Sequence, residues 1–149
     1  MRWTLLLVAS LGLFASLAYF KVQALVVRTE KGKIVALKVA KQGDVVEIHH
    51  VNSIFDAPVT ELLEVRGKEL HLAGVYTPSH GVKEYYGIGT AHSAGERRWR
   101  KLTFMSTGAL RFRVCVNERF LFEGQSFSLA LEDLRVAQLV FRLCRPLSF

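Results

Sequence analysis

The chain has 149 residues, half of them hydrophobic, and its 20 lysine and arginine residues outnumber 13 acidic ones to give a formal net charge of +7. That length corresponds to one domain with a sizeable core. The hydrophobic content excludes a chain that is disordered over most of its length. The positive charge suits an anionic partner such as a lipid surface, nucleic acid or acidic polysaccharide, or a basic surface with no dedicated partner.

An unbroken apolar run occupies residues 3–20, directly after a single arginine. As a helix of about 27 Å, it would nearly match the ~30 Å hydrocarbon core of a bilayer. The run also fits the apolar region of a signal peptide, with small residues before two candidate cleavage points, after Ala18 and after Ala24. We therefore expect residues 1–24 to be a membrane anchor or a signal peptide, and residues 25–149 to form the folded domain.

Two signals in this region predict opposite sides of the membrane for the domain. Four lysine and arginine residues follow within residues 21–33 and only Arg2 precedes, so the positive-inside rule places the domain in the cytoplasm. A secretory signal, by contrast, needs only a short basic N-terminus and directs the export of the rest of the chain. We expect a domain at the cell membrane on its extracytoplasmic side. Secretion after cleavage and a cytoplasmic orientation are the alternatives.

Beyond the apolar run, hydrophobic residues mostly alternate with polar ones between short turn sequences, which is typical of antiparallel strands. The expected strands are residues 25–28, 34–39, 45–51, 59–65, 69–75, 101–105, 110–116, 120–122 and 127–131. Compact turns at residues 31–32 and 66–68 predict two hairpins. Many short strands at this spacing favour an all-β fold, either an antiparallel sandwich or a small, partly open barrel, preceded by the N-terminal helix.

Two segments are less regular. Residues 76–98 are rich in glycine, serine, threonine and histidine, which predicts a long loop interrupted by a short aromatic piece at Tyr85 and Tyr86. The tail combines charged residues every three to four positions, which suits a helix, with an alternation that suits a strand. We predict a strand at residues 139–144, with one helical turn near residues 131–134.

The two cysteines are Cys115 and Cys144. The alternation places Cys115 on the outer face of its strand with Arg111 and Arg113, and Cys144 on the face of Arg142. If the two strands are neighbours in an oxidising compartment, the cysteines form a disulfide; otherwise they are two separate thiols. No C-x-x-C is present, so nothing supports redox chemistry or a zinc–thiolate site.

No motif of known catalytic chemistry occurs in the sequence. The five histidines lack the spacing of a metal site, and the adjacent His49 and His50 point to opposite faces of a strand. No G-x-S-x-G surrounds a serine. Gly87 and Gly89 suit a turn with positive φ better than a phosphate cradle, because no helix is expected after them. We therefore predict no catalytic residues, no metal site and no cofactor.

The densest basic cluster is Arg97, Arg98, Trp99, Arg100 and Lys101. A mixture of arginine and tryptophan can bind phosphate groups or lie at a lipid headgroup layer. The alternative, which we favour, is the start of a strand whose tryptophan packs inward between solvated arginines.

The junction at residues 52–61 reads Asn-Ser-Ile-Phe-Asp-Ala-Pro-Val-Thr-Glu and lies between two expected strands. Its asparagine and Asp56 suit capping of a turn through backbone amides. Pro58 suits extended chain at the start of a strand, where it would end the pairing. The glutamate that closes the junction would then meet Ser53 or His50 across the hairpin. We interpret the junction as a structural motif first and as a candidate site second.

This junction, together with the Tyr-Gly-Ile-Gly at residues 86–89, resembles an uncharacterised prokaryotic family known as domain of unknown function 1850. Members often carry His-Ser-Val, two residues, Thr-Pro-Val, one residue and Glu, followed by a Phe/Tyr-Gly-Ala-Gly turn. The matching residues are Ser53, Pro58, Val59, Glu61, Gly87 and Gly89. Asn52 stands where the family usually has histidine, Ala57 stands where it has threonine, and the proline that often follows the turn is absent. The resemblance covers about residues 25–91.

The resemblance implies a small exported or membrane-anchored protein, as the members of the family are. These members are often encoded beside TRAP transporters of the TAXI class. It implies a membrane partner, such as a transporter subunit or a solute-binding protein, and supplies no reaction. The candidate ligand-binding residues, which come from the junction and the glycine turn, are Asn52, Ser53, Asp56, Pro58, Glu61, Tyr86, Gly87 and Gly89.

We therefore predict a non-enzymatic accessory or binding module associated with a membrane transporter, without a nucleic-acid partner. One alternative is a small exported hydrolase with a site around His50, Ser53, Asp56 and Glu61. The other is an envelope protein held to anionic lipid or polymer by residues 97–101.

Overall fold

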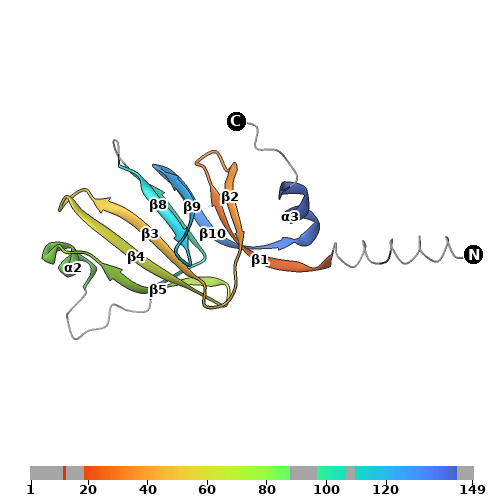
Figure 1. Ribbon diagram of the computed structural model, residues 1–149, viewed down its shortest axis with the longest axis horizontal. Coiled ribbons are helices and arrows are strands. Elements are labelled where there is room, and N and C mark those ends of the chain that lie inside the picture. Colours follow the sequence, from red (N-terminus) through yellow and green to blue (C-terminus); the bar gives the residue numbers. More distant parts are fainter. Residues whose placement is uncertain (1–11, 13–18, 88–96, 107–109, 144–149) are drawn as a thin grey trace, which may run out of the picture.

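The computed structural model describes residues 12, 19–87, 97–106 and 110–143, which form two antiparallel β-sheets and two short helices (Figure 1). The predicted anchor or signal segment lies almost wholly outside these residues. Within the described chain, no helix is long and apolar enough to cross a membrane. Strand β1 (Lys21–Arg28) begins four residues before the expected start of the domain, and its Ala24 is fully buried. Cleavage after Ala18 would leave this strand whole, whereas cleavage after Ala24 would remove its first half.

The strands are divided between a small and a large sheet. The small sheet has the order β2 (Ile34–Val39), β1, β10 (Ser126–Arg135) and β7 (Lys101–Met105). The large sheet has the order β6 (Arg98–Trp99), β5 (Glu69–Tyr76), β4 (Ala57–Arg66), β3 (Val45–Asn52), β8 (Phe112–Val116) and β9 (Arg119–Gly124). The nine strands predicted between residues 25 and 131 each have a counterpart, and both predicted hairpins are present. The prediction of an all-β antiparallel fold is confirmed.

One hydrophobic core joins the inner faces of the two sheets. Because side chains alternate along a strand, the small sheet contributes every second residue of β1 and β10, among them Leu25, Val27 and Phe127. The large sheet contributes residues such as Ile48 and Leu63 from β3 and β4. All five are at most 1% exposed. Each such side chain contributes about 1.5–3 kcal/mol when it leaves water, so this shared core is what holds the sheets together.

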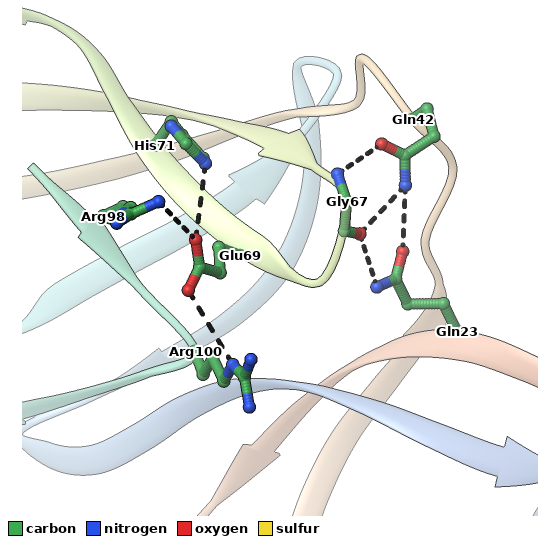
Figure 2. Close-up of polar contacts among 7 residues, drawn as sticks. All are labelled: Gln23, Gln42, Gly67, Glu69, His71, Arg98 and Arg100. Carbon is green, nitrogen blue, oxygen red and sulfur yellow. Dashed lines mark hydrogen bonds and ion pairs between the residues drawn. The ribbon is translucent and has the colours of Figure 1, made fainter. Parts of the chain in front are cut away.

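A polar cluster ties the sheets together at the end where the chain enters β1 (Figure 2). The Gln23 amide nitrogen donates to the carbonyl oxygen of Gly67 at 2.8 Å, and the Gln42 amide nitrogen donates to the same oxygen at 3.0 Å. The Gly67 backbone N–H donates back to Gln42 Oε1 at 2.6 Å. Gly67 belongs to the β4–β5 turn and has a φ of 61°, a conformation that glycine adopts without strain. The turn of the large sheet is thereby fixed to the small one.

Helix α2 (His80–Tyr86) lies within the segment predicted as a long loop, so that prediction is wrong for its first part. The Ser79 hydroxyl caps the helix by accepting from the Val82 N–H at 3.3 Å, and Gly87 ends it in the left-handed conformation. Val82 packs on Ala57 and Val59 of β4. These two residues share the parity of the core residues of β4, so α2 covers part of the inner face of the large sheet. A seven-residue helix offers too few turns for its periodicity to stand out in the sequence.

Helix α3 (Val136–Leu143) replaces the predicted strand at residues 139–144, which is therefore wrong. The helical turn expected near residues 131–134 is wrong as well, because β10 continues to Arg135, which pairs with Lys21 of β1. Leu139 of the helix packs against Ala24 and Val26, on the outer face of the small sheet. The charged residues at every third or fourth position of the tail correctly indicated a helix, whereas the alternation of apolar residues wrongly indicated a strand.

The two helices mark opposite ends of the molecule (Figure 1). At one end of β10, Arg135 pairs with Lys21, where the chain enters the domain. At its other end, Ser126 pairs with Met105 of β7. Ten residues of strand separate these two ends by about 30 Å. The β3–β4 hairpin and α2 lie away from the entry point of the chain.

The Gly81→Ala substitution tests how closely α2 is packed. A Cβ atom at Gly81 would lie 2.5 Å from Cε1 of Phe55, in the β3–β4 turn. Overpacking costs about 1–3 kcal/mol, and the better helix propensity of alanine offsets up to ~1 kcal/mol. We expect a net loss of about 1 kcal/mol in the free energy of unfolding, measured by urea denaturation. Gly74→Ala is the matched control, because its Cβ would lie 3.5 Å from Tyr76, an ordinary contact. Equal stability of the two variants would contradict this packing.

Candidate functional site

Three side chains form a hydrogen-bonded group on the inner face of the large sheet, beside α2. In the β3–β4 ladder, Ile48 is opposite Glu61 and His50 is opposite Val59, so His50 and Glu61 are diagonal neighbours on one face. Glu61 Oε1 accepts a hydrogen bond from the Tyr86 hydroxyl at 2.5 Å and contacts His50 Nε2 at 3.2 Å. The predicted contact between Glu61 and His50 is confirmed. Its alternative, a contact with Ser53, does not occur within the described chain.

The Glu61 carboxylate is ionised at neutral pH although it is largely buried. The side chains of His50 and Glu61 are only 12% and 17% exposed. Burial pushes the pKa of Glu61 upward, but the hydrogen bonds from His50 and Tyr86 outweigh it. The charges of His50 and Arg97 act in the same direction, so the pKa ends below that of an ordinary glutamate. Burial and the hydrogen bond to Glu61 raise the pKa of Tyr86, which keeps its hydroxyl protonated as a donor.

An open pocket of about 170 Å³ lies next to His50, at the end of the sheets opposite the chain entry. Its polar lining consists of His50, Asn52, Ser53, Ser106 and Arg111. Apolar residues complete the wall, and the ring of Phe112 lies 5.3 Å from the His50 ring, centroid to centroid. His50 therefore lies between the buried Glu61 carboxylate, which its Nε2 atom contacts, and the open pocket, which it lines.

The β3–β4 turn positions the residues at the rim of this pocket. Asn52 Oδ1 accepts from the backbone N–H groups of Ile54 at 3.0 Å and Phe55 at 3.2 Å, which is the capping predicted for it. The capping predicted for Asp56 does not occur within the described chain. Asp56 instead adopts a φ of 44°, which aspartate tolerates better than most residues. The turn thus presents Ser53 at the pocket and leaves Asp56 outside it.

Pro58 and Gly87, two further residues of the predicted site, do not line the pocket and instead shape the backbone. Pro58 does not end the β3–β4 pairing as predicted, since the ladder continues through it to the pair of Asn52 and Ala57. Its missing N–H is tolerated there because β5 pairs with β4 only from Thr60 onward. Gly87 has a φ of 69° at the end of α2, as expected of a turn glycine. Gly89 lies outside the described residues.

Arg111 and Phe112 are site residues that sequence reasoning missed. They enter the site because β8 pairs with β3, where Arg113 is opposite His49. The paired residues are more than 60 positions apart in the chain, and no local sequence pattern predicts a pairing over that separation. The basic character of residues 111–113 was visible in the sequence, but only as an outer strand face.

Within the predicted basic cluster, Trp99 lies against the core, and Arg98 and Arg100 lie beside one carboxylate. Trp99 pairs with Leu70 and packs against the core, which confirms the inward tryptophan. Figure 2 shows Arg98 and Arg100 on either side of the Glu69 carboxylate, each with a nitrogen 3.7 Å from one of its oxygens. The Nε2 atom of His71 lies 3.8 Å from the same group. Glu69 therefore offsets part of the positive charge that an anionic surface would meet.

The described histidines and Cys115 do not gather into a common site. No group of three or more histidine, cysteine, aspartate or glutamate side chains among the described residues is arranged to hold a metal ion. His49 points away from His50 and contacts the Thr60 hydroxyl at 3.0 Å through Nδ1. Cys115, predicted on the outer face of its strand, is a free thiol that is only 9% exposed, and burial and the Glu47 carboxylate raise its pKa. Cys144 lies outside the described residues, so the disulfide stays a prediction.

No protein-family model, no curated protein and no solved structure matches the chain. The resemblance to domain of unknown function 1850 therefore stays a prediction.

Replacing Glu61 by glutamine tests its ionised state. Because the folded-state pKa is lowered, the carboxylate stabilises the fold above the unfolded-state pKa, and this contribution is lost as the pH falls through the folded-state value. At about pH 7, Glu61→Gln should lower the free energy of unfolding by about 1–3 kcal/mol, the range for hydrogen bonds to charged groups. The difference should shrink in urea titrations below about pH 4.

Glu30→Gln is the matched control, because Glu30 lies exposed in the β1–β2 turn. It should change stability little at any pH. A difference between Glu61→Gln and the unchanged protein that stays constant from neutral to acid pH would contradict an ionised Glu61.

Removing the Tyr86 hydroxyl tests the second hydrogen bond to the carboxylate. Tyr86→Phe keeps the ring that packs beside Val59 and deletes the 2.5 Å donor. With burial unchanged and one stabilising bond lost, the pKa of Glu61 should rise, as measured by the carboxyl carbon shift in an NMR titration. Tyr85→Phe is the control, because Tyr85 is 65% exposed. An unchanged Glu61 pKa in Tyr86→Phe would show that the hydroxyl does not stabilise the anion.

Proposed function

We propose that the chain is a non-enzymatic binding module that works at a membrane beside a transporter. The observation that carries the proposal is the pocket at one end of the sheets, with His50 held at its border by Glu61, which in turn accepts a hydrogen bond from Tyr86. A fixed ring, a turn held by Asn52 and a polar lining are what a binding site needs before its ligand arrives. The membrane and transporter parts of the proposal rest on the apolar run at residues 3–20 and on the family resemblance.

The position of the pocket supports this arrangement. If residues 1–20 anchor the chain, the domain attaches through Lys21, at the end of β10 marked by Arg135. The pocket includes Met105, which pairs with Ser126 at the other end of that strand. Its opening would then lie about 30 Å from the attachment point, clear of the headgroups. In the proposed arrangement, a sandwich follows an N-terminal helix, is exposed on the extracytoplasmic side and meets a transporter subunit or a solute-binding protein.

One observation favours the hydrolase alternative. Glu61 orients His50, and Ser53 lines the same pocket, as in a serine nucleophile with its base and orienting acid. No hydrogen bond joins Ser53 to His50 in the described part of the chain, however, and Asp56 stands outside the pocket. Steady hydrolysis of p-nitrophenyl acetate that is lost in Ser53→Ala would replace the binding proposal with this one.

A pull-down of the full chain from its own membranes in mild detergent tests the proposed function. We expect a transporter subunit or a solute-binding protein in near-stoichiometric amount. Ser53→Trp places bulk at the pocket and should remove that partner, because Ser53 lines the opening. Glu30→Trp adds the same bulk in the exposed β1–β2 turn and should retain the partner. Recovery of the chain alone, or equal loss in both variants, would contradict a partner that binds at the pocket.

A further inference from the structure

We propose that the end of the domain where the chain enters β1 lies on an anionic lipid surface, with helix α3 in the headgroup layer. This entry surface consists of Tyr19, Phe20, Lys21, Arg135 and Val140. The inference rests on the membrane part of the proposed function, and it names the surface and the kind of lipid that the domain contacts. The juxtaposition that carries it is an exposed apolar group beside two like charges, directly after the apolar run at residues 3–20.

Three large apolar side chains of the entry surface are exposed. Tyr19, Phe20 and Val140 are 82%, 62% and 54% exposed. The Val136 N–H donates to the carbonyl oxygen of Phe20 at 2.9 Å, so α3 begins beside the start of β1 (Figure 1). Val140 lies one helical turn after Val136, on the same side of α3. The exposed side chains therefore belong to one end of the domain, where an apolar group indicates a contact rather than scattered single residues.

The lengths of the elements place this group at the depth of the lipid headgroups. If residues 3–20 span the hydrocarbon core, Phe20 marks the boundary of that core. The headgroup layer beyond the boundary is roughly 5–8 Å thick. Val140 follows Val136 by four residues, which is about 6 Å along the helix. Val140 therefore lies within reach of the headgroup layer, and an aromatic residue such as Tyr19 is typical of the membrane interface.

Two basic residues face each other across the β1–β10 ladder at the same end. Lys21 is directly opposite Arg135, and both are exposed. Like charges in this position destabilise a strand pair. Among the described residues, no acidic side chain lies within ion-pair distance of either one. The nearby Asp133 is hydrogen-bonded to Lys68, which leaves an excess of positive charge at this end of the ladder. Anionic headgroups would neutralise that excess.

The apolar group and the two charges lie on different faces of the small sheet and meet at its end. Lys21 and Arg135 have the parity of the core residues of β1 and β10, whereas α3 packs on the outer face. Lys21 directly follows Phe20, and Arg135 directly precedes Val136. A surface that meets this end of the ladder therefore contacts both faces at once. A lipid headgroup layer suits both, because its phosphates meet the charges while apolar side chains enter beneath them.

A fluorescent probe on the full chain, reconstituted into vesicles, tests the proposal. Val140→Cys and Met105→Cys, each in a chain with both native cysteines replaced by alanine, carry NBD at exposed apolar positions at opposite ends of the domain. The vesicles contain equal parts of phosphatidylcholine and phosphatidylglycerol, and a lipid with a nitroxide headgroup is the quencher. NBD at residue 140 should lose most of its emission. NBD at residue 105 should keep its emission, because it lies about 30 Å from the entry surface.

Equal quenching at the two positions would overturn the proposal. So would the absence of quenching at residue 140, which is the result expected if a protein rather than lipid covers the entry surface.

Two double variants test the charges with the same probe at residue 140. Lys21→Gln with Arg135→Gln removes the proposed headgroup contacts, and Lys31→Gln with Lys33→Gln is the matched control in the β1–β2 turn. All four side chains are exposed, so the fold should survive each change. In the anionic vesicles, the ratio of docked to undocked domain should fall about tenfold or more in the first variant. The control should stay within about twofold of the unchanged chain.

Equal effects of the two double variants would overturn the proposal. Quenching at residue 140 that is as strong in vesicles of phosphatidylcholine alone would also overturn it, because the contact would then not depend on anionic lipid.

This proposal and the proposed function fail separately. A partner recovered in the pull-down and lost in Ser53→Trp, without quenching at residue 140, overturns the lipid contact and leaves the binding module standing. Quenching that depends on Lys21 and Arg135, with the chain recovered alone in the pull-down, supports the lipid contact and removes the transporter association.

Discussion

The large sheet has more inner face than the small sheet covers, and much of the molecule is shaped by that mismatch. Six strands lie on one side of the core and four on the other. Apolar residues left uncovered would expose hydrophobic area to water at about 25 cal/mol per Å². Helix α2 covers part of this surplus by placing Val82 on Ala57 and Val59. Between the residues that this helix covers and those of the shared core, the inner face carries Glu61 and His50.

That change from apolar to polar residues explains the electrostatics of the site. A carboxylate that is 17% exposed is costly unless it is paired and hydrogen-bonded. Glu61 meets this requirement with partners from two different elements, His50 from the neighbouring strand and Tyr86 from the helix. The same contacts fix the His50 ring and join α2 to the sheet. One carboxylate therefore joins α2 to the sheet and also fixes the His50 ring at the border of the pocket.

Local signals in the sequence were enough for the strands and insufficient for the pocket. Alternation and turn residues identified the nine strands, because both are properties of neighbouring residues. The contact between His50 and Glu61 was predictable for the same reason, since a tight hairpin fixes their register. Arg111 and Phe112 reach the pocket only through the pairing of β8 with β3. Tyr86 reaches Glu61 through the docking of a helix that is too short to be recognised in the sequence. In the tail, two periodicities competed, and packing of Leu139 on the small sheet decided for the helix.

The place of β1 in the small sheet has a mechanical consequence. This eight-residue strand is the one to which the N-terminal segment is joined, and it is paired on both sides, with β2 and with β10. A pull on the chain ahead of Lys21 acts along the strand axis, so it loads the ladder bonds of both neighbours in shear rather than opening them one after another. The Gln23 side chain adds a cross-tie to the other sheet close to the point of loading. A domain tethered through this strand would resist extraction by force better than one tethered through an edge strand.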